Sequence, residues 1–281
     1  HWCNFMFSKN FSKKIIQAFK LVINQSFPIC EAGLRIIGGR DALQDEFPFA
    51  IRLEIKIVNN DGHSNNIEYE HLCTGAAVSS KWILSAAHCY IDDGYEIVAR
   101  YSSHFPKNMG KISPILKVYI HPQYNELRIE LNQNDIALFL SQNILVPQYG
   151  KISAVDYKAL VGHEVNILGF GYTNATSSEK PLQVLNGMLI KCLENEISCY
   201  DYSSTNMCVV PLCGVEASIC GGDSGGPVVH SSGIVGVNSR AMDDCNEFTI
   251  NFKRTPGYSA SIVAMVSHEL DWVSRVISTT F

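Results

Sequence analysis

The sequence predicts an all-β fold, either a sandwich or a barrel, followed by one α-helix at the C-terminus. From Ile36 onward, short apolar segments alternate with turn residues at a spacing typical of antiparallel strands rather than of βαβ units. Near the C-terminus the apolar residues recur instead at three- and four-residue steps, which indicates a helix. A chain of 281 residues, 46% of them hydrophobic, can bury the core of one large domain or of two small ones.

The expected strands are segments rich in Val, Ile, Leu, Phe and Tyr. They cover Phe49–Val58, Lys81–Ser85, Lys111–Ile120, Ile136–Leu140, Val165–Gly169 and Gly233–Val237. The sequence Asn59-Asn60-Asp61-Gly62 predicts a turn after the first of them. The expected helix carries its apolar face on Val263, Val266, Leu270, Val273 and Ile277, and this face should pack on the body of the protein.

Residues 1–35 form an N-terminal segment with a different composition. The segment holds five basic residues and one acidic residue, so the rest of the chain carries 17 basic and 26 acidic residues. Polar residues interrupt its apolar stretch, which is a poor match to the core of a signal peptide. We interpret the segment as the remnant of a secretory leader followed by an activation prosegment. A disordered basic tail is the alternative.

Composition excludes several classes of function. A formal net charge of −5 argues against a nucleic-acid partner, and no apolar run is long enough for a membrane-spanning helix. Ten cysteines favour disulfides in an oxidising compartment, hence a secreted protein. No CxxC pair occurs, so we expect no structural zinc site. The sequence shows no sign of another metal or of a cofactor, so we expect none, while calcium binding by a surface loop stays open.

The segment Gly222-Asp223-Ser224-Gly225-Gly226-Pro227 carries the most specific chemical signal. A serine hydroxyl becomes a strong nucleophile only when a base takes its proton, and glycines let backbone N–H groups approach an oxyanion closely. The pattern also satisfies the Gly-x-Ser-x-Gly elbow of α/β-hydrolases. Those enzymes place the acid and the histidine after the serine, whereas the chymotrypsin arrangement places both before it.

Both partners lie upstream of Ser224 in this chain. His88 ends a strand-like segment beside Cys89, and Asp135 immediately precedes an apolar strand. Downstream, His230 and His268 have no comparable setting. The order histidine, aspartate, serine therefore favours the chymotrypsin arrangement over the α/β-hydrolase one.

With Ile36-Ile37-Gly38-Gly39, these segments make residues 36–281 resemble the trypsin/chymotrypsin family of serine proteases. The resemblance implies two six-stranded antiparallel β-barrels, an active site in the cleft between them and a C-terminal helix. It also implies that Ser224 is the nucleophile, His88 the general base and Asp135 the residue that orients His88. The N–H groups of Gly222 and Ser224 would form the oxyanion hole. The stretch from His104 to Tyr124 is similar to mite digestive trypsins and their paralogues.

The resemblance further implies a zymogen. Cleavage between Arg35 and Ile36 by a trypsin-like activating protease would free the Ile36 ammonium, which would pair with the carboxylate of Asp223. The expected product is a monomeric, secreted endopeptidase that acts on proteins or peptides and is open to macromolecular inhibitors. The implied disulfides are Cys73–Cys89, Cys192–Cys208 and Cys220–Cys245. The partners of the other four cysteines stay open, namely Cys3, Cys30, Cys199 and Cys213.

The substrate pocket departs from the family pattern. Counting from Ser224 puts the neutral Ser218 at the pocket base, where trypsins carry aspartate, so a preference for apolar side chains is expected. The segment Gly236-Val237-Asn238 would replace the substrate-binding Ser-Trp-Gly. Gly236 would then remove a hydroxyl that supports the aspartate, and Asn238 would put a side chain at the mouth of the pocket. Gly257 would also belong to the pocket. These departures support a second hypothesis, a catalytically impaired paralogue with an occluded pocket that acts as a binding or decoy protein.

Overall fold

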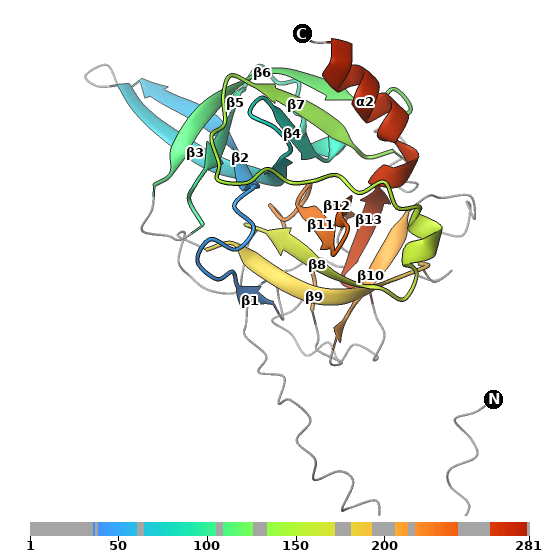
Figure 1. The fold of residues 1–281 in the computed structure, drawn as a ribbon. Coiled ribbons are helices and arrows are strands. Elements are labelled where there is room, and N and C mark those ends of the chain that lie inside the picture. The colour runs from blue at the N-terminus through green and yellow to red at the C-terminus, as the bar shows by residue number, and fades with distance from the viewer. Residues whose placement is uncertain are drawn as a thin grey trace, which may run out of the picture. The chain divides into compact units, whose positions relative to one another are not determined.

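The computed structural model describes residues 36, 39–60, 65–104, 109–125, 134–171, 181–192, 206–212, 217–240 and 259–279. Within these residues, two closed six-stranded antiparallel β-barrels stand next to each other, and one helix follows them (Figure 1). The barrels and the C-terminal helix expected from the resemblance are confirmed. None of the helices in the described part of the chain has the length and apolar character needed to cross a membrane.

The first barrel follows the strand order β2-β3-β4-β7-β6-β5. Its strands are β2 (Ala50–Asn60), β3 (Asn65–Ala77), β4 (Trp82–Ser85), β5 (Glu96–Tyr101), β6 (Lys111–Ile120) and β7 (Ala137–Ser141). The long hairpin of β2 and β3 pairs from Ala50↔Ala76 out to Asn60↔Asn65. Asn59 and Asn60 of the predicted turn therefore belong to β2, while Asp61 and Gly62 lie outside the described residues. β5 pairs only with Arg52–Lys56 of β2, and the hairpin tip therefore projects beyond the barrel (Figure 1).

The second barrel is a sheet in the order β9-β10-β13-β12-β11-β8 that closes through pairing of β8 with β9. Its strands are β8 (Glu164–Gly169), β9 (Gln183–Ile190), β10 (Met207–Pro211), β11 (Pro227–His230), β12 (Gly233–Arg240) and β13 (Ser261–Met265). The short strand β1 (Arg40–Asp41) adds to the outside of β9. Short 3₁₀ helices occur at Ala87–Cys89, Tyr157–Leu160 and Val266–His268.

The C-terminal helix α2 runs from Leu270 to Thr279, so it is shorter than the periodicity predicted. Val263 lies in β13, because residues Ser261–Met265 pair with both β10 and β12. The helix packs Leu270, Trp272, Val276 and Ile277 against a core cluster that contains residues of both barrels. A second cluster fills the inside of the second barrel and a third that of the first barrel.

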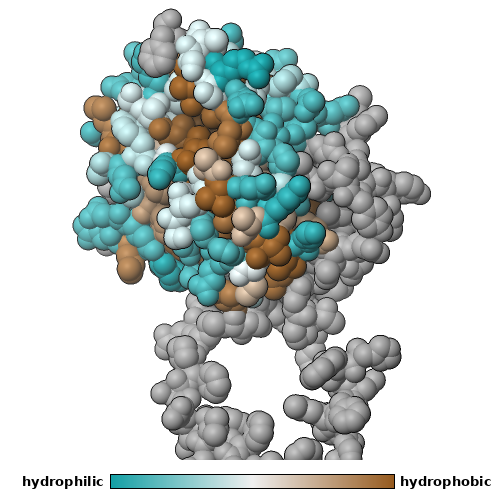
Figure 2. Space-filling view, turned by 45° about the vertical axis from the view of Figure 1, so that its right-hand side comes forward, coloured by the Kyte–Doolittle hydropathy of each residue, from teal (hydrophilic) through white to brown (hydrophobic). Residues whose placement is uncertain are grey.

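Apolar residues form a band on the face shown in Figure 2, flanked and interrupted by hydrophilic ones. The most exposed large apolar side chains among the described residues include Met109, Leu43 and Leu116. They come from separate elements, and isolated exposed apolar side chains are common on protein surfaces. The band therefore identifies no partner by itself.

Candidate active site

The three residues of the predicted triad come from three separate elements. His88 lies on the 3₁₀ turn Ala87–Cys89 that follows β4, Asp135 precedes β7, and Ser224 lies in the turn before β11. Asp135 holds His88 at two points, since its Oδ1 accepts the backbone N–H of His88 at 3.0 Å and its Oδ2 lies 2.8 Å from Nδ1. This pairing fixes Nδ1 as the donor and leaves Nε2 to act as a base.

Hydrogen bonds hold Asp135 in its ionised form. Burial alone would raise the pKa of this carboxyl, but the hydrogen bonds and the charge of His88, together with a hydrogen bond from Ser239, lower the pKa below its ordinary value. The carboxyl is almost completely buried and remains available to stabilise an imidazolium. No hydrogen bond joins His88 Nε2 to Ser224 Oγ in the described structure, and such contacts often tighten only when substrate binds.

The position of Ser239 differs from one expectation that was drawn from the sequence. Gly236 was expected to leave Asp135 without a supporting hydroxyl, but Ser239 Oγ, three residues further along β12, donates to Asp135 Oδ2 at 2.6 Å. Asn238 does not reach a pocket mouth either. Its side chain is fully buried, accepts a hydrogen bond from Ser261 Oγ, and donates weakly to the carbonyls of Leu168 and Asp223. The residue of β12 that supports Asp135 is therefore Ser239, three positions after Gly236, where the resemblance placed it.

Two N–H groups of the catalytic loop have no acceptor among the residues that the structure describes. In the turn from Gly222 to Gly226, the N–H of Asp223 donates to Cys220, that of Gly225 to Asn238 and that of Gly226 to Asp223. The N–H groups of Gly222 and Ser224 make no hydrogen bond within the part of the chain that the structure describes. They are the two predicted oxyanion donors. An oxyanion formed at Ser224 could accept both, which is worth roughly 10²–10³ in rate for each donor.

Glycine is required at position 222 for two reasons. Its φ is 90°, in the region that only glycine adopts easily, and a Cβ would lie 2.6 Å from the ring of His71. His71 Nε2 lies 3.1 Å from the Gly222 carbonyl, and Thr74 Oγ1 donates to the same carbonyl at 2.8 Å. Neither His71 nor Thr74 belongs to the segments from which the sequence predicted the triad.

Comparisons with known proteins agree with this geometry. The family model named Trypsin matches residues 36–258, which is most of the chain. The chain belongs to the trypsin family of serine proteases. It is 28% identical to human "Serine protease 1" over 249 residues, or 87% of this chain and 90% of that protein. It is 30% identical to "Trypsin" of the beetle Phaedon cochleariae over 221 residues, or 73% and 78% of the two chains.

A third relative of this trypsin-family protein has a different activity in its name. "Venom peptide isomerase heavy chain" of Agelenopsis aperta is 25% identical over 260 residues, or 85% of this chain and 99% of that protein. The similarity to mite trypsins stays a prediction.

The predicted pocket residues lie mostly inside the second barrel. Ser218 is fully buried, and its hydroxyl donates to the carbonyl of Ile219 at 3.1 Å. Gly236 and Val237 belong to β12, where they pair with Met265 and Ala264. Gly257 lies outside the described residues. Of the predicted set, only Ser218 lies in the chain segment that leads into the catalytic loop.

The predicted activation residues are partly described. Ile36 is fully buried in the core cluster of the second barrel, together with Ala217 and Ile219. Asp223 is also fully buried, and its carboxylate accepts the N–H of Gly171 at 2.7 Å and that of Cys220 at 2.8 Å. A side chain at Gly171 would overlap this carboxylate. Arg35 lies outside the described residues.

Two of the implied disulfides are formed, Cys73–Cys89 and Cys192–Cys208. Cys220 is also disulfide-bonded, while Cys245 lies outside the described residues, as do Cys3, Cys30, Cys199 and Cys213. The first disulfide ties β3 to the turn of His88. Among the described residues, one group has the spacing of metal ligands, namely Cys73, His88 and Cys89. Because the sulfurs of the two cysteines form a disulfide, they are not thiolates that could bind a metal.

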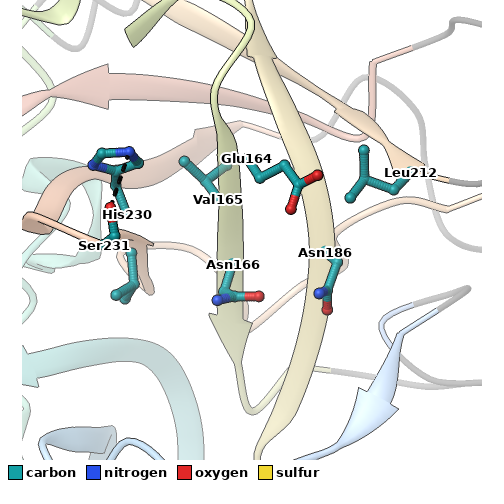
Figure 3. Close-up of a pocket in the computed structure, with 8 residues that line it drawn as sticks. Glu164, Val165, Asn166, Asn186, Leu212, His230 and Ser231 are labelled. Carbon is teal, nitrogen blue, oxygen red and sulfur yellow. Dashed lines mark hydrogen bonds between the residues drawn. The ribbon is translucent and has the colours of Figure 1, made fainter.

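A pocket of about 490 Å³ lies on the second barrel (Figure 3). It is lined by residues of β8, β9 and β11, by Ser231 directly after β11 and by Leu212 directly after β10: Glu164, Val165, Asn166, Asn186, Leu212, Val229, His230 and Ser231. Figure 3 shows His230 beside Ser231 at one end and Asn166 and Asn186 on neighbouring strands. None of the predicted catalytic or substrate-binding residues lines this pocket.

Proposed function

We propose that the protein is a secreted serine endopeptidase that cleaves peptide bonds through an acyl-enzyme on Ser224. The observation that carries this proposal is a His88–Asp135 pair supported by Ser239, together with the N–H groups of Gly222 and Ser224, which have no acceptor among the described residues. His88 would take the proton of Ser224 and later deliver it to the leaving amine. The oxyanion would accept the N–H groups of Gly222 and Ser224.

The proposed preference is for apolar rather than basic side chains on the amino side of the cleaved bond. Ser218 offers no charge to pair with Arg or Lys of a substrate. Its hydroxyl already donates to Ile219, so an apolar side chain would leave no new buried donor there without an acceptor.

The proposed activation is a cleavage between Arg35 and Ile36. The burial of Ile36 in the second barrel and the burial of Asp223 next to the catalytic loop support this step. A new ammonium at Ile36 would pair with Asp223, and a buried charge pair of this kind works as a switch because an unpaired buried charge costs several kcal/mol. A trypsin-like protease in the same extracellular compartment would act as the activator.

The test uses the full chain after cleavage at Arg35–Ile36, with N-terminal sequencing to verify the new end. The parent and Ser224→Ala are treated with a fluorescent fluorophosphonate and with peptides that carry Phe, Leu or Arg before the cleaved bond. We expect labelling and turnover of the Phe and Leu peptides by the parent, and neither by Ser224→Ala. A folded, cleaved parent without labelling would refute the enzyme and support the binding or decoy role. Labelling without turnover would point to an occluded pocket.

A further inference from the structure

We propose that Thr74 of the first barrel is a positioning residue, which holds the catalytic loop in the conformation that presents its two oxyanion donors. This inference rests on the proposed function for its kinetic consequence only, because the structural consequence can be measured on an inactive protein. Thr74 lies on β3 and is fully buried. Neither its motif context nor its spacing from the triad predicted a role.

Thr74 contacts the catalytic loop twice and the rest of the molecule twice. Its N–H donates to the carbonyl of Ser224 at 2.9 Å, and its Oγ1 donates to the carbonyl of Gly222 at 2.8 Å. Oγ1 also accepts the N–H of Phe170 at 3.0 Å, and its own carbonyl accepts the hydroxyl of Ser85 at 2.8 Å. One residue thereby connects the strand β3, the loop before β11 and the segment that follows β8.

These contacts constrain the peptide units on both sides of the Ser224 N–H. The carbonyl of Gly222 belongs to the peptide unit before Asp223, and the N–H at the other end of this unit donates to Cys220. The carbonyl of Ser224 belongs to the unit before Gly225, whose N–H donates to Asn238. Both units are therefore fixed at each end. The unit between them carries the Ser224 N–H, which has no acceptor of its own within the described residues.

The hydroxyl of Thr74 can hydrogen-bond to the carbonyl of Gly222 only when its hydrogen points toward that carbonyl. A hydroxyl has one hydrogen, and because the N–H of Phe170 uses the acceptor side of Oγ1, the hydrogen is free to go to Gly222. His71 Nε2 is the second group on this carbonyl. Gly222 has the permissive backbone of glycine, so losing one of two restraints on its carbonyl should loosen its N–H as well.

The experiment compares the activated parent with Thr74→Ala, Thr74→Ser and the control Ser113→Ala. Alanine removes the hydroxyl without introducing a group that could clash with the Gly222 carbonyl. Ser113 is a matched control, since its buried hydroxyl in the first barrel likewise accepts a backbone N–H, that of Asn143 at 3.0 Å. For each protein we measure kcat and KM per titrated active site, and hydrogen exchange of the peptide that covers residues 221–227.

We expect Thr74→Ala to lower kcat by about tenfold with KM nearly unchanged, because a misplaced oxyanion donor weakens only the transition state. Hydrogen exchange in residues 221–227 should become faster, Thr74→Ser should restore both quantities, and Ser113→Ala should change neither. Unchanged kcat and unchanged exchange in Thr74→Ala would overturn the proposal. A parent that lacks all turnover would contradict the proposed function instead, and the exchange comparison would still decide the role of Thr74.

Discussion

At the level of single residues, buried hydroxyls outside the recognisable motifs hold the motif residues in place. Ser239 donates to Asp135, Thr74 donates to Gly222, and Ser85 donates to Thr74. Each of these hydrogen bonds joins groups that water would otherwise satisfy, so a lost partner leaves a buried polar atom at a cost of about 1–3 kcal/mol. The geometry of the triad therefore depends on residues that take no direct part in the proposed reaction.

Removing the hydroxyl of Ser239 should weaken the hydrogen bonding of Asp135 in the triad. The lowered pKa of Asp135 means that the ionised carboxyl stabilises the native state above its ordinary pKa, and this contribution is lost as the pH falls through the lowered value. In Ser239→Ala the pKa of Asp135 should rise, because a hydrogen bond that favours the charged form is gone. We expect kcat to fall about tenfold, and the free energy of unfolding at pH 7 to fall by about 1 kcal/mol relative to the parent, with this difference shrinking as the pH falls toward about 3. A stability difference that stays constant with pH would contradict this, and Ser141→Ala is the control.

Arg240 should influence which charged substrates are accepted. It follows Ser239 at the end of β12, its side chain is exposed, and it makes no hydrogen bond or ion pair in the described structure. We expect Arg240→Glu to lower kcat/KM about three- to tenfold for peptides with Asp or Glu near the cleaved bond and to raise it for those with Lys. The difference should shrink in high salt. Lys111→Glu makes the same charge change on β6, and an equal effect there would argue against a local role.

At the level of elements, the sequence predicted strands best where a segment rich in apolar residues is bounded by turn residues. Lys111–Ile120 and Lys81–Ser85 are close to β6 and β4. The beginning of β3, Asn65–His71, is mostly polar and was not among the expected strand segments, but it forms because β2 supplies a partner along its whole length. Val263 fitted a helical pattern and is a strand residue, because pairing with two neighbours outweighs a weak periodicity.

In the candidate site, too, the residues that lie in a recognisable short segment were predicted, whereas those whose role depends on residues far away in the sequence were not. His88, Asp135 and Ser224 were predicted because each sits in a short segment with its own signal. Ser239 and Thr74 could not be predicted, because their partners lie 104 and 148 residues away along the chain. Asn238 in the interior of a strand looked like a pocket residue, and only its buried hydrogen bonds to Leu168, Asp223 and Ser261 explain why it is tolerated there.

The attachment of helix α2 can be tested through one buried pair. His121 Nε2 lies 2.7 Å from Glu269 Oε2, while its Nδ1 accepts the N–H of Gln123, so Nε2 is the donor to Glu269. The ring of His121 also meets that of Trp272 edge to face at 4.9 Å. We expect Glu269→Ala to lower the free energy of unfolding by about 2–3 kcal/mol in urea titrations, because the donor on His121 then loses its partner.

Asp271→Ala is the matched control for this prediction. Asp271 is an exposed acid in the first turn of the same helix, and its loss should cost only about 0.5 kcal/mol. The pair His121 and Glu269 should also show a coupling energy above about 1 kcal/mol in a double-mutant cycle. Equal losses for Glu269→Ala and Asp271→Ala would mean that the buried pair does not anchor the helix.

At the level of the whole molecule, the candidate site depends on the contact between the two barrels. Strand β3 of the first barrel reaches the catalytic loop of the second through Thr74, while Asp135 of the first receives Ser239 of the second. A further contact lies at His104, whose carbonyl accepts the N–H of Leu182 and whose ring packs on Phe170. Anything that weakens the packing between the barrels should therefore weaken catalysis together with stability.

Acid should weaken this contact through His104. The buried imidazole has a lowered pKa, mainly because burial disfavours the charged form. A hydrogen bond with the backbone of Ala50 and the charge of Asp45 oppose this effect, and nearby Arg52 adds a smaller lowering effect. The native state therefore keeps His104 neutral at pH values where the unfolded chain, with a histidine pKa near 6.5, already binds a proton. The stability that the neutral ring contributes is complete above about pH 6.5 and is lost as the pH falls toward the lowered value.

The variant His104→Gln separates this effect from all other titrating groups, because glutamine stays uncharged at every pH. We expect the parent to be more stable than His104→Gln at pH 8, and the difference in free energy of unfolding to shrink steadily between pH 6.5 and pH 5. Urea titrations at these three pH values, with the disulfides intact, measure it. A difference that stays constant with pH would show that the imidazole takes up its proton without disturbing the barrels. In the other outcome, the stability difference shrinks while fluorophosphonate labelling falls in parallel in the parent but not in His104→Gln. That result would show that the contact between the barrels, rather than the triad, sets the pH range of the active site.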